Sequence, residues 1–282
     1  MAKIIHDEFN CIDRIALTDD PVSDFSVVMQ GIQLDCRLNQ KVKNDYLIVT
    51  PNGAVDRTKV ELPAFARWNW HGIFNSNILA ISDPTLHFDQ NIPIGWFAGT
   101  KYQNVAAFVA DVVVKVASLL DIPPNKIVFW GSSAGGFASI SLASEIDGAC
   151  FVSANGQTDI LNYYAGHIEH FRRVFDPNFS AESLASKYPE KWSAITALQN
   201  SYDAMKSTHG VIVQNIIDAK HYNEHYIPFC NHFHLPIEGG SVEKLNLHSL
   251  LFSHEKGHGP EPAEIAKQVV EEYLPKLLGE NK

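Results

Sequence analysis

The segment Lys126-Ile-Val-Phe-Trp-Gly-Ser-Ser-Ala-Gly-Gly136 indicates how this chain of 282 residues folds. Its first half, 126–130, is a continuous apolar run, which is typical of a strand buried on both faces of a parallel sheet. A pattern rich in small residues follows over 134–146 and predicts a helix. Only very small side chains fit a sharp turn between a strand and the helix packed behind it. The segment therefore predicts a strand, a tight turn with Ser133 at its apex, and a helix.

Apolar runs elsewhere predict a mostly parallel sheet with helices on both faces, which is an α/β fold. A hairpin is expected over 25–38, and helices are expected over 104–120 and 262–278. Further buried strands are predicted at 46–50, 78–81, 149–153, 211–216 and 247–252. In sheets of this kind, ligands bind beyond the carboxyl ends of the strands.

One segment interrupts the alternation of strands and helices. Residues 157–210 contain aromatic and basic side chains and no strand pattern. We expect them to form a helical cap insertion within a single domain that spans residues 1–282. The chain has no internal repeat and no linker rich in Gly, Pro or Ser that would divide it.

The composition argues against several classes of protein. A net charge of −10 disfavours nucleic acid as the main partner, because phosphate binding needs a basic face. The four cysteines are far apart and form no CxxC pair, so neither a disulfide framework nor a metal cluster is expected, and a cytoplasmic location is predicted. No run approaches the roughly 20 apolar residues of a membrane span, and the start of the chain has no secretory pattern.

Ser133 is the expected nucleophile, because it lies midway between Gly131 and Gly135; Ser132 is the alternative. A serine hydroxyl needs a general base to become a good nucleophile. We expect that base in the loop after the last strand, where His258 lies between two glycines and His254 is its competitor.

A carboxylate is needed to orient the base, and three candidates follow strands. Asp218 comes after the strand at 211–216 and is the first choice. Asp159 is the runner-up, and Glu224 is a weaker third.

Two hydrogen-bond donors are expected to stabilise a developing oxyanion. One is the backbone N–H of Ala134, directly after the nucleophile. The other comes from the loop after the strand at 46–50, as a backbone N–H of Gly53 or Ala54 or the side-chain amide of Asn52. The sequence does not choose between these three.

Three residues are candidates for substrate binding. Trp68, in an aromatic and polar group at 67–71, can stack on a sugar ring or pack in a surface loop. Arg172 can meet an anionic group or lie on a solvated helix face, and His221 lies near Asp218 and can line the site. His221 also belongs to a histidine cluster, but no acidic or cysteine ligand completes a familiar spacing, so no metal is expected.

From Tyr46 to Leu278 the ordered motifs resemble the α/β-hydrolase superfamily. The resemblance rests on the turn at Ser133, the Asp218 loop and the Gly-His258-Gly loop. It implies an α/β-hydrolase fold and acyl transfer through a Ser133–Asp218–His258 triad, with no bound cofactor.

A narrower resemblance rests on Ile48-Val-Thr-Pro-Asn-Gly53, Ile81-Ser-Asp-Pro-Thr-Leu86 and Gly95-Trp-Phe-Ala-Gly-Thr100. These motifs are similar to those of bacterial proteins linked to surface-polysaccharide assembly, including capsule O-acetyltransferases. The resemblance implies that Trp96 shapes the rim of the pocket and that acetyl-CoA is the acyl donor if the reaction is a transfer.

The leading functional expectation is an esterase-like serine acyl hydrolase acting on a small-molecule or carbohydrate ester. An O-acyltransferase that acts on a polysaccharide is the first alternative, and a non-catalytic assembly protein with a hydrolase-like fold is the second. Neither fold nor composition chooses among esterases, peptidases and acyltransferases, and a homo-oligomer is left open.

Overall fold

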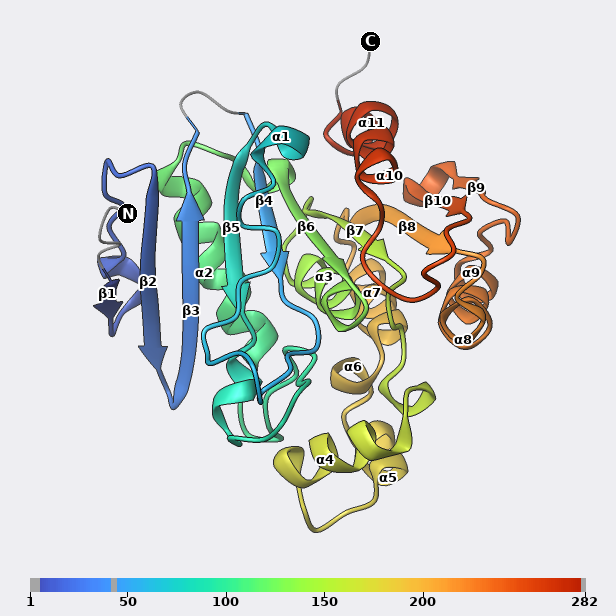
Figure 1. Ribbon diagram of the computed structural model, residues 1–282, viewed down its shortest axis with the longest axis horizontal. Helices are drawn as coiled ribbons and strands as arrows, with labels where there is room; N and C mark the ends of the chain where they lie inside the picture. The colour runs from blue at the N-terminus through green and yellow to red at the C-terminus, as the bar shows by residue number, and fades with distance from the viewer. Residues whose placement is uncertain (1–5, 42–44, 280–282) are drawn as a thin grey trace.

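The computed structural model describes residues 6–41 and 45–279, in which ten strands form one sheet (Figure 1). Its strand order is β1-β2-β3-β5-β4-β6-β7-β8-β10-β9. The strands are β1 (His6–Phe9), β2 (Val22–Met29), β3 (Ile32–Asn39), β4 (Leu47–Pro51), β5 (Asn77–Ser82), β6 (Ile127–Ser132), β7 (Cys150–Ala154), β8 (His209–Asn215), β9 (Gly240–Val242) and β10 (Leu247–Phe252).

Six neighbouring strands, from β5 through β4, β6, β7 and β8 to β10, run parallel. The hairpin of β2 and β3 extends the sheet antiparallel at one side, and β9 pairs antiparallel with β10 at the other. Every strand expected from an apolar run is present. The sequence did not predict β1 and β9, which are short edge strands without such a run.

The helices are α1 (His71–Phe74), α2 (Val105–Leu119), α3 (Ala134–Glu145), α4 (Ala165–Phe175), α5 (Ala181–Lys187), α6 (Pro189–Trp192), α7 (Ala194–Asp203), α8 (Ala219–His221), α9 (Ile227–Phe233), α10 (Ala263–Gln268) and α11 (Leu274–Leu277). The π-helical turns Tyr222–Tyr226 and Val269–Tyr273 join α8 to α9 and α10 to α11. Short 3₁₀ segments lie at Ile12–Arg14, Pro84–His87, Pro124–Lys126, Ile160–Asn162 and Glu243–Leu245.

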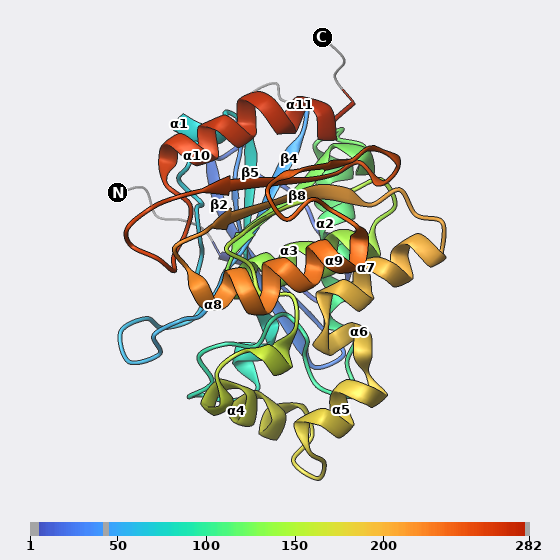
Figure 2. The same ribbon diagram turned by 90° about the vertical axis from the view of Figure 1, so that its right-hand side faces the viewer.

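The sheet separates two hydrophobic cores, because alternate side chains of a strand point to opposite faces. In β6, Phe129 belongs to the core that α2, α3 and α7 cover, whereas Trp130 belongs to the core under α1, α10 and α11. Figure 2 shows α10 and α11 on one side of the sheet and α3 and α9 on the other. Burial on both faces explains why the central strands are apolar at every position.

The segment 157–210 contains the helices α4 to α7, and β8 begins at His209, two residues before the expected strand. Its first helices, α4 and α5, extend away from the sheet (Figure 1). The last helix, α7, packs against α3 and so belongs to the helical layer. None of the helices in the described part of the chain has both the length and the apolar character needed to cross a membrane.

The turn between β6 and α3 brings strand and helix into direct backbone contact. A Cβ atom on Gly131 would lie 2.1 Å from the carbonyl oxygen of Gly135, which no side chain tolerates. Ser133 has φ 55°, in the left-handed region that non-glycine residues adopt only where surrounding structure imposes it. This strain presents the Ser133 side chain above the carboxyl edge of the sheet.

We therefore expect Gly131→Ala to lower the free energy of unfolding by about 3 kcal/mol or more, since the strand and helix must separate. Gly166→Ala is the matched control, because a Cβ at this helical position in α4 meets nothing within 4 Å. It should be neutral or stabilising by up to about 1 kcal/mol. Urea unfolding of both variants measures the difference, and equal stabilities would contradict the packing described.

Candidate active site

Three side chains from the ends of three strands meet above the sheet. Nε2 of His258 lies 3.0 Å from Oγ of Ser133, and Nδ1 of His258 lies 2.6 Å from Oδ2 of Asp218. An ionised carboxylate only accepts hydrogen bonds, so Nδ1 carries the proton and donates it. Nε2 is then the acceptor for the Ser133 hydroxyl. The arrangement can withdraw a proton from Oγ and hold the resulting imidazolium against a carboxylate.

The carboxylate of Asp218 receives further hydrogen bonds from His221. The backbone N–H of His221 donates to Oδ1 at 3.3 Å, and its Nδ1 lies 3.1 Å from each carboxylate oxygen. Burial by itself would raise the pKa of Asp218, but the hydrogen bonds from His221 and His258 outweigh it and hold the pKa well below its ordinary value. Asp218 is therefore ionised throughout the neutral range.

His221 stacks on His258, with ring centroids 3.9 Å apart and planes 12° from parallel. Burial lowers the pKa of His221, opposed by its hydrogen bond to Asp218, so that its imidazole is neutral at pH 7. Asp218, His221 and His258 place ligand atoms within 4.8 Å of one another, which is compact enough for a metal ion. However, nearly parallel rings direct their nitrogen lone pairs side by side rather than toward one point. This geometry suits hydrogen bonds to a carboxylate better than metal ligation.

The other candidates for base and acid lie elsewhere. Asp159 caps the 3₁₀ turn at Ile160–Asn162 and accepts from the N–H of Leu161 at 2.8 Å. Glu224 forms an ion pair with Lys220. The backbone of His254 is bound by Asn215, and its Nδ1 accepts from the backbone N–H of Lys256 at 3.4 Å within its own loop.

In the described part of the chain, no acceptor is found for the backbone N–H groups of Gly53 and Ala54 in the loop after β4, or for that of Ala134 directly after Ser133. A Cβ on Gly53 would lie 3.3 Å from the carbonyl oxygen of Ser132, so this loop touches the turn at the nucleophile. The side chain of Asn52 is occupied within the loop, since it donates to the carbonyl of Gly53 and accepts from the N–H of Asp83, each at 2.7 Å. Asn52 thus shapes the loop, and the N–H of Ala134 together with that of Gly53 or Ala54 is free to bind an anion.

The loop that carries His258 is held by two asparagines at the ends of neighbouring strands. Nδ2 of Asn215 donates to the carbonyls of His254 and Gly257, each at 2.8 Å. Asn155 donates to the carbonyl of Gly259 at 2.8 Å. Neither asparagine was among the candidate site residues expected from the sequence.

Glu261 fixes the far end of the same loop. Its carboxylate accepts hydrogen bonds from Arg67 and from the indole of Trp130, each at 2.6 Å, in a fully buried setting. Only two residues lie between this anchor and His258, so the loop has little freedom to move. Glu261 was also missed, because its role depends on contacts with distant parts of the chain.

Gln157 is a further residue that the sequence did not single out. Its Nε2 donates to Oγ of Ser133 at 3.0 Å, and its Oε1 accepts from the indole N–H of Trp96. Trp96 is only 1% exposed, so it does not form the rim that the narrower resemblance implied. It reaches the site through Gln157 instead.

The predicted substrate-binding residues have different surroundings. Trp68 lines a groove of about 590 Å³ that also borders the loop 52–54. The guanidinium of Arg37, paired with Asp24, lies 4.8 Å from the ring centroids of both Trp68 and Phe65.

Arg172, by contrast, lies on α4 and donates its hydrogen bonds to residues close to it in the chain. It forms an ion pair with Glu169 and donates to the carbonyls of Pro177 and Phe179. The structure does not bring it to Ser133, because these contacts hold it against its own helix and the loop that follows.

Burial of His225 beneath His221 makes the stability of the protein depend on pH. Burial, followed by the charges of His221 and Lys220, lowers the pKa of His225 from 6.5 to about 3. The unfolded chain binds this proton more readily than the folded one below about pH 6.5, so stability is complete above that pH and falls as the pH decreases toward about 3.

We expect the free energy of unfolding to fall with decreasing pH below about 6, at up to about 1.4 kcal/mol per pH unit for this proton. His225→Asn removes the titration and keeps an acceptor for the N–H of Thr158, which Nδ1 of His225 accepts at 3.2 Å. Its stability should therefore vary less with pH than that of the wild type. Urea unfolding between about pH 7 and about pH 4 measures both slopes, and equal slopes would contradict the assignment.

No protein-family model matches the sequence, and no curated protein matches it. Solved structures do resemble the chain. The capsule O-acetyltransferase of Neisseria meningitidis serogroup A superposes with a TM-score of 0.57 at 13% identity, over 89% of this chain and 96% of that one. Acetyl xylan esterase 1 from a Thermoanaerobacterium species gives a TM-score of 0.57 at 11% identity, over 92% of this chain and 86% of that one.

The acylaminoacyl peptidase of Pyrococcus horikoshii gives a TM-score of 0.63 at 11% identity, over 93% of this chain and 42% of that one. At such identities the likeness concerns the fold. It extends over 89% to 93% of this chain.

Proposed function

We propose, from the α/β-hydrolase fold of this chain, that the protein is a serine enzyme that transfers acyl groups through an acyl-enzyme on Ser133. The observation that carries the proposal is the continuous hydrogen-bonded path from Oγ of Ser133 through the imidazole of His258 to the carboxylate of Asp218. In this proposal Ser133 is the nucleophile, His258 is the general base, and Asp218 orients the base and stabilises its protonated form.

The first half of the reaction forms the acyl-enzyme. Oγ of Ser133 attacks the carbonyl carbon of an ester while its proton passes to Nε2 of His258. The carbonyl oxygen becomes an oxyanion that accepts from the N–H of Ala134 and from a donor in the loop 52–54. One such donor contributes about 3 kcal/mol to transition-state stabilisation in serine hydrolases. The intermediate then expels the alcohol or thiol, which takes the proton from His258.

The second half releases the acyl group. His258 withdraws a proton from an incoming nucleophile, which attacks the acyl carbon and restores Ser133. Water as the nucleophile makes the protein an esterase, which is the leading proposal. A sugar hydroxyl in its place makes the protein an O-acyltransferase, with the same residues in the same roles and acetyl-CoA as the donor.

The groove beside the loop 52–54 supports a carbohydrate ester as substrate. Trp68 and Phe65 provide aromatic faces on which a sugar ring can stack, and the Asp24–Arg37 pair offers polar atoms to hydroxyl groups. Because the loop 52–54 forms one wall, a ligand in the groove lies beside the proposed oxyanion donors. An acylated sugar is therefore the substrate class that we propose.

The transferase is the second candidate, and the likeness to a capsule O-acetyltransferase over 89% of this chain favours it. A non-catalytic assembly protein is the alternative from another class. The hydrogen bonds among Ser133, His258 and Asp218 argue against it, because a protein without catalysis needs no base in contact with a serine at a strained turn.

One activity screen tests these proposals. Wild type and Ser133→Ala are compared with p-nitrophenyl acetate, an acetylated xylo-oligosaccharide, and acetyl-CoA with or without an unacetylated oligosaccharide. We expect wild type to release acetate from the esters. Ser133→Ala should lose at least about 1000-fold in kcat/KM, because removing the nucleophile of a triad costs nearly as much catalysis as removing all three members. The exposed Ser180→Ala variant is the control and should retain wild-type rates.

The acceptor decides between hydrolase and transferase. Consumption of acetyl-CoA only in the presence of the oligosaccharide would assign the transferase, and acetate release that is independent of the oligosaccharide would assign the esterase. Equal rates for wild type and Ser133→Ala on every substrate would overturn the proposed function.

A further inference from the structure

We propose that Gln157 is a further catalytic residue, whose side-chain amide donates a hydrogen bond to the nucleophilic oxygen of Ser133, and that Trp96 is the positioning residue that fixes this amide. The inference rests on the proposed function, because it assigns both roles at the same nucleophile. It goes beyond the triad and the oxyanion donors, neither of which includes these residues.

Gln157 contacts Ser133 twice. Its Nε2 lies 3.0 Å from Oγ, and its backbone N–H donates to the carbonyl oxygen of Ser133 at 3.1 Å. The residue is completely buried at the end of the loop that follows β7. A buried amide is costly unless its hydrogen bonds are made, so both contacts are expected to persist. Gln157 therefore fixes the backbone and the side chain of the nucleophile together.

The orientation of the Gln157 amide follows from its neighbours. An indole N–H only donates, so the amide atom that faces Nε1 of Trp96 is the oxygen, and the amide nitrogen faces Ser133. The hydroxyl proton of Ser133 is committed to His258, so Oγ needs a donor on its other side. Two independent requirements thus give the same orientation.

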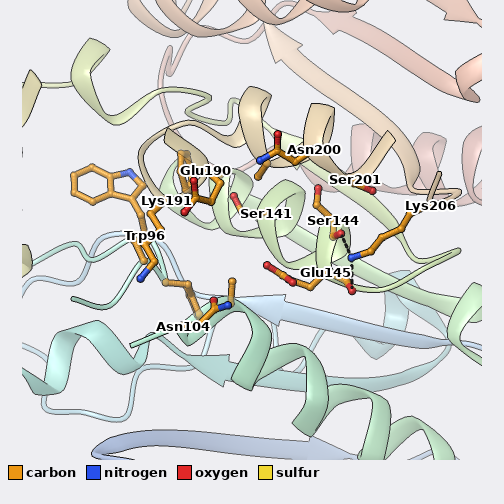
Figure 3. Close-up of a pocket in the computed structure, with 15 residues that line it drawn as sticks. Trp96, Asn104, Ser141, Ser144, Glu145, Glu190, Lys191, Asn200, Ser201 and Lys206 are labelled. Atoms are coloured by element: carbon orange, nitrogen blue, oxygen red, sulfur yellow. Dashed lines mark hydrogen bonds between the residues drawn. The ribbon is translucent and has the colours of Figure 1, made fainter. Parts of the chain in front are cut away.

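Trp96 is well placed to hold that orientation. Its φ of 54° lies in the left-handed region, and its ring meets the rings of Tyr163 and Phe171 edge-on, with centroids 6.0 and 5.3 Å away. Figure 3 shows its indole at one end of a cavity of about 180 Å³ beside α3. The same indole thus lines this cavity and donates to the amide oxygen of Gln157.

The donor at Oγ acts in both halves of the proposed reaction. As the proton passes from Oγ to His258 and the bond from Oγ to carbon forms, negative charge develops on Oγ. Charge develops there again when that bond breaks and His258 returns the proton. A hydrogen bond to a charged oxygen is about twice as strong as one to a neutral oxygen, so the Gln157 donor stabilises both transition states. The proposed oxyanion donors, at Ala134 and in the loop 52–54, serve the carbonyl oxygen of the substrate instead.

The first test uses a fluorophosphonate probe, which needs no natural substrate. Oγ of Ser133 attacks the phosphorus, fluoride leaves, and His258 accepts the hydroxyl proton. Gln157→Met keeps the length of the side chain and removes the donor, and it should slow labelling by about 10-fold to 100-fold. Gln214→Met is the matched control, because Gln214 is equally buried but donates to the carbonyl of Asn215. It should label at the wild-type rate.

The second test asks whether Trp96 acts through Gln157. Trp96→Phe removes the indole N–H and leaves an aromatic ring at the edge of the cavity. Labelling should slow by about threefold to tenfold in the wild-type background and should not slow further in the Gln157→Met background. Additive losses would overturn the positioning role of Trp96.

A pH profile separates a donor from a packing role. In Gln157→Glu, the substituted carboxyl donates to Oγ when it is protonated and repels the developing charge when it is ionised. The labelling rate relative to wild type should therefore fall as the pH rises, whereas a packing role predicts a constant ratio.

The outcomes distinguish this inference from the proposed function. Labelling of wild type but not of Ser133→Ala would support the proposed function. If Gln157→Met then labels at the wild-type rate, or if the labelling rate of Gln157→Glu relative to wild type does not change with pH, the inference alone is overturned. Equal decreases in labelling rate in Gln157→Met and Gln214→Met would also overturn it, because replacing any buried glutamine would then have the same effect. Failure of wild type to label at Ser133 would overturn the proposed function and the inference together.

Discussion

The contact between β6 and α3 at Gly131 and Gly135 is the constraint on which the rest of the structure depends. Because no side chain fits between the two backbones, the chain turns sharply and holds Ser133 at a positive φ above the sheet. The helix that begins directly behind this turn leaves the N–H of Ala134 without an acceptor. One steric requirement therefore presents both the hydroxyl group and an anion-binding donor.

The other parts of the site are held mainly by polar contacts. Parallel strands end at the same edge, which brings the loops after β6, β7, β8 and β10 together. The His258 loop has few apolar residues, and Asn155, Asn215 and Glu261 bind its backbone or anchor its end. Because each anchor begins in the sheet or in the core, the imidazole stands at a fixed distance from Ser133. Such pre-organisation is what base catalysis requires.

The sequence predicted the fold well because burial on both faces leaves a local signal, namely apolar runs separated by helical patterns. The solved structures confirm that fold. Chain order also brought Asp218 and His258 into consideration with Ser133. Gln157, Asn215 and Glu261 were missed because their partners are distant in the chain, and an isolated polar residue has no periodicity. Trp96 was assigned from the narrower resemblance and Arg172 from its residue type, and neither source reveals that Trp96 is buried and that Arg172 is paired locally.

The central claim is that Ser133 carries the acyl group during the reaction. Rapid acid quenching of the protein during turnover of p-nitrophenyl acetate, followed by proteolysis and mass spectrometry, tests it directly. The account predicts an acetyl group on the peptide that contains Ser133. It also predicts that His258→Ala, once acylated by an ester more reactive than p-nitrophenyl acetate, accumulates more of this acetylated peptide, because deacylation is slow without the base. Acetylation of other residues only, or turnover with an unmodified Ser133 peptide in both proteins, would contradict it.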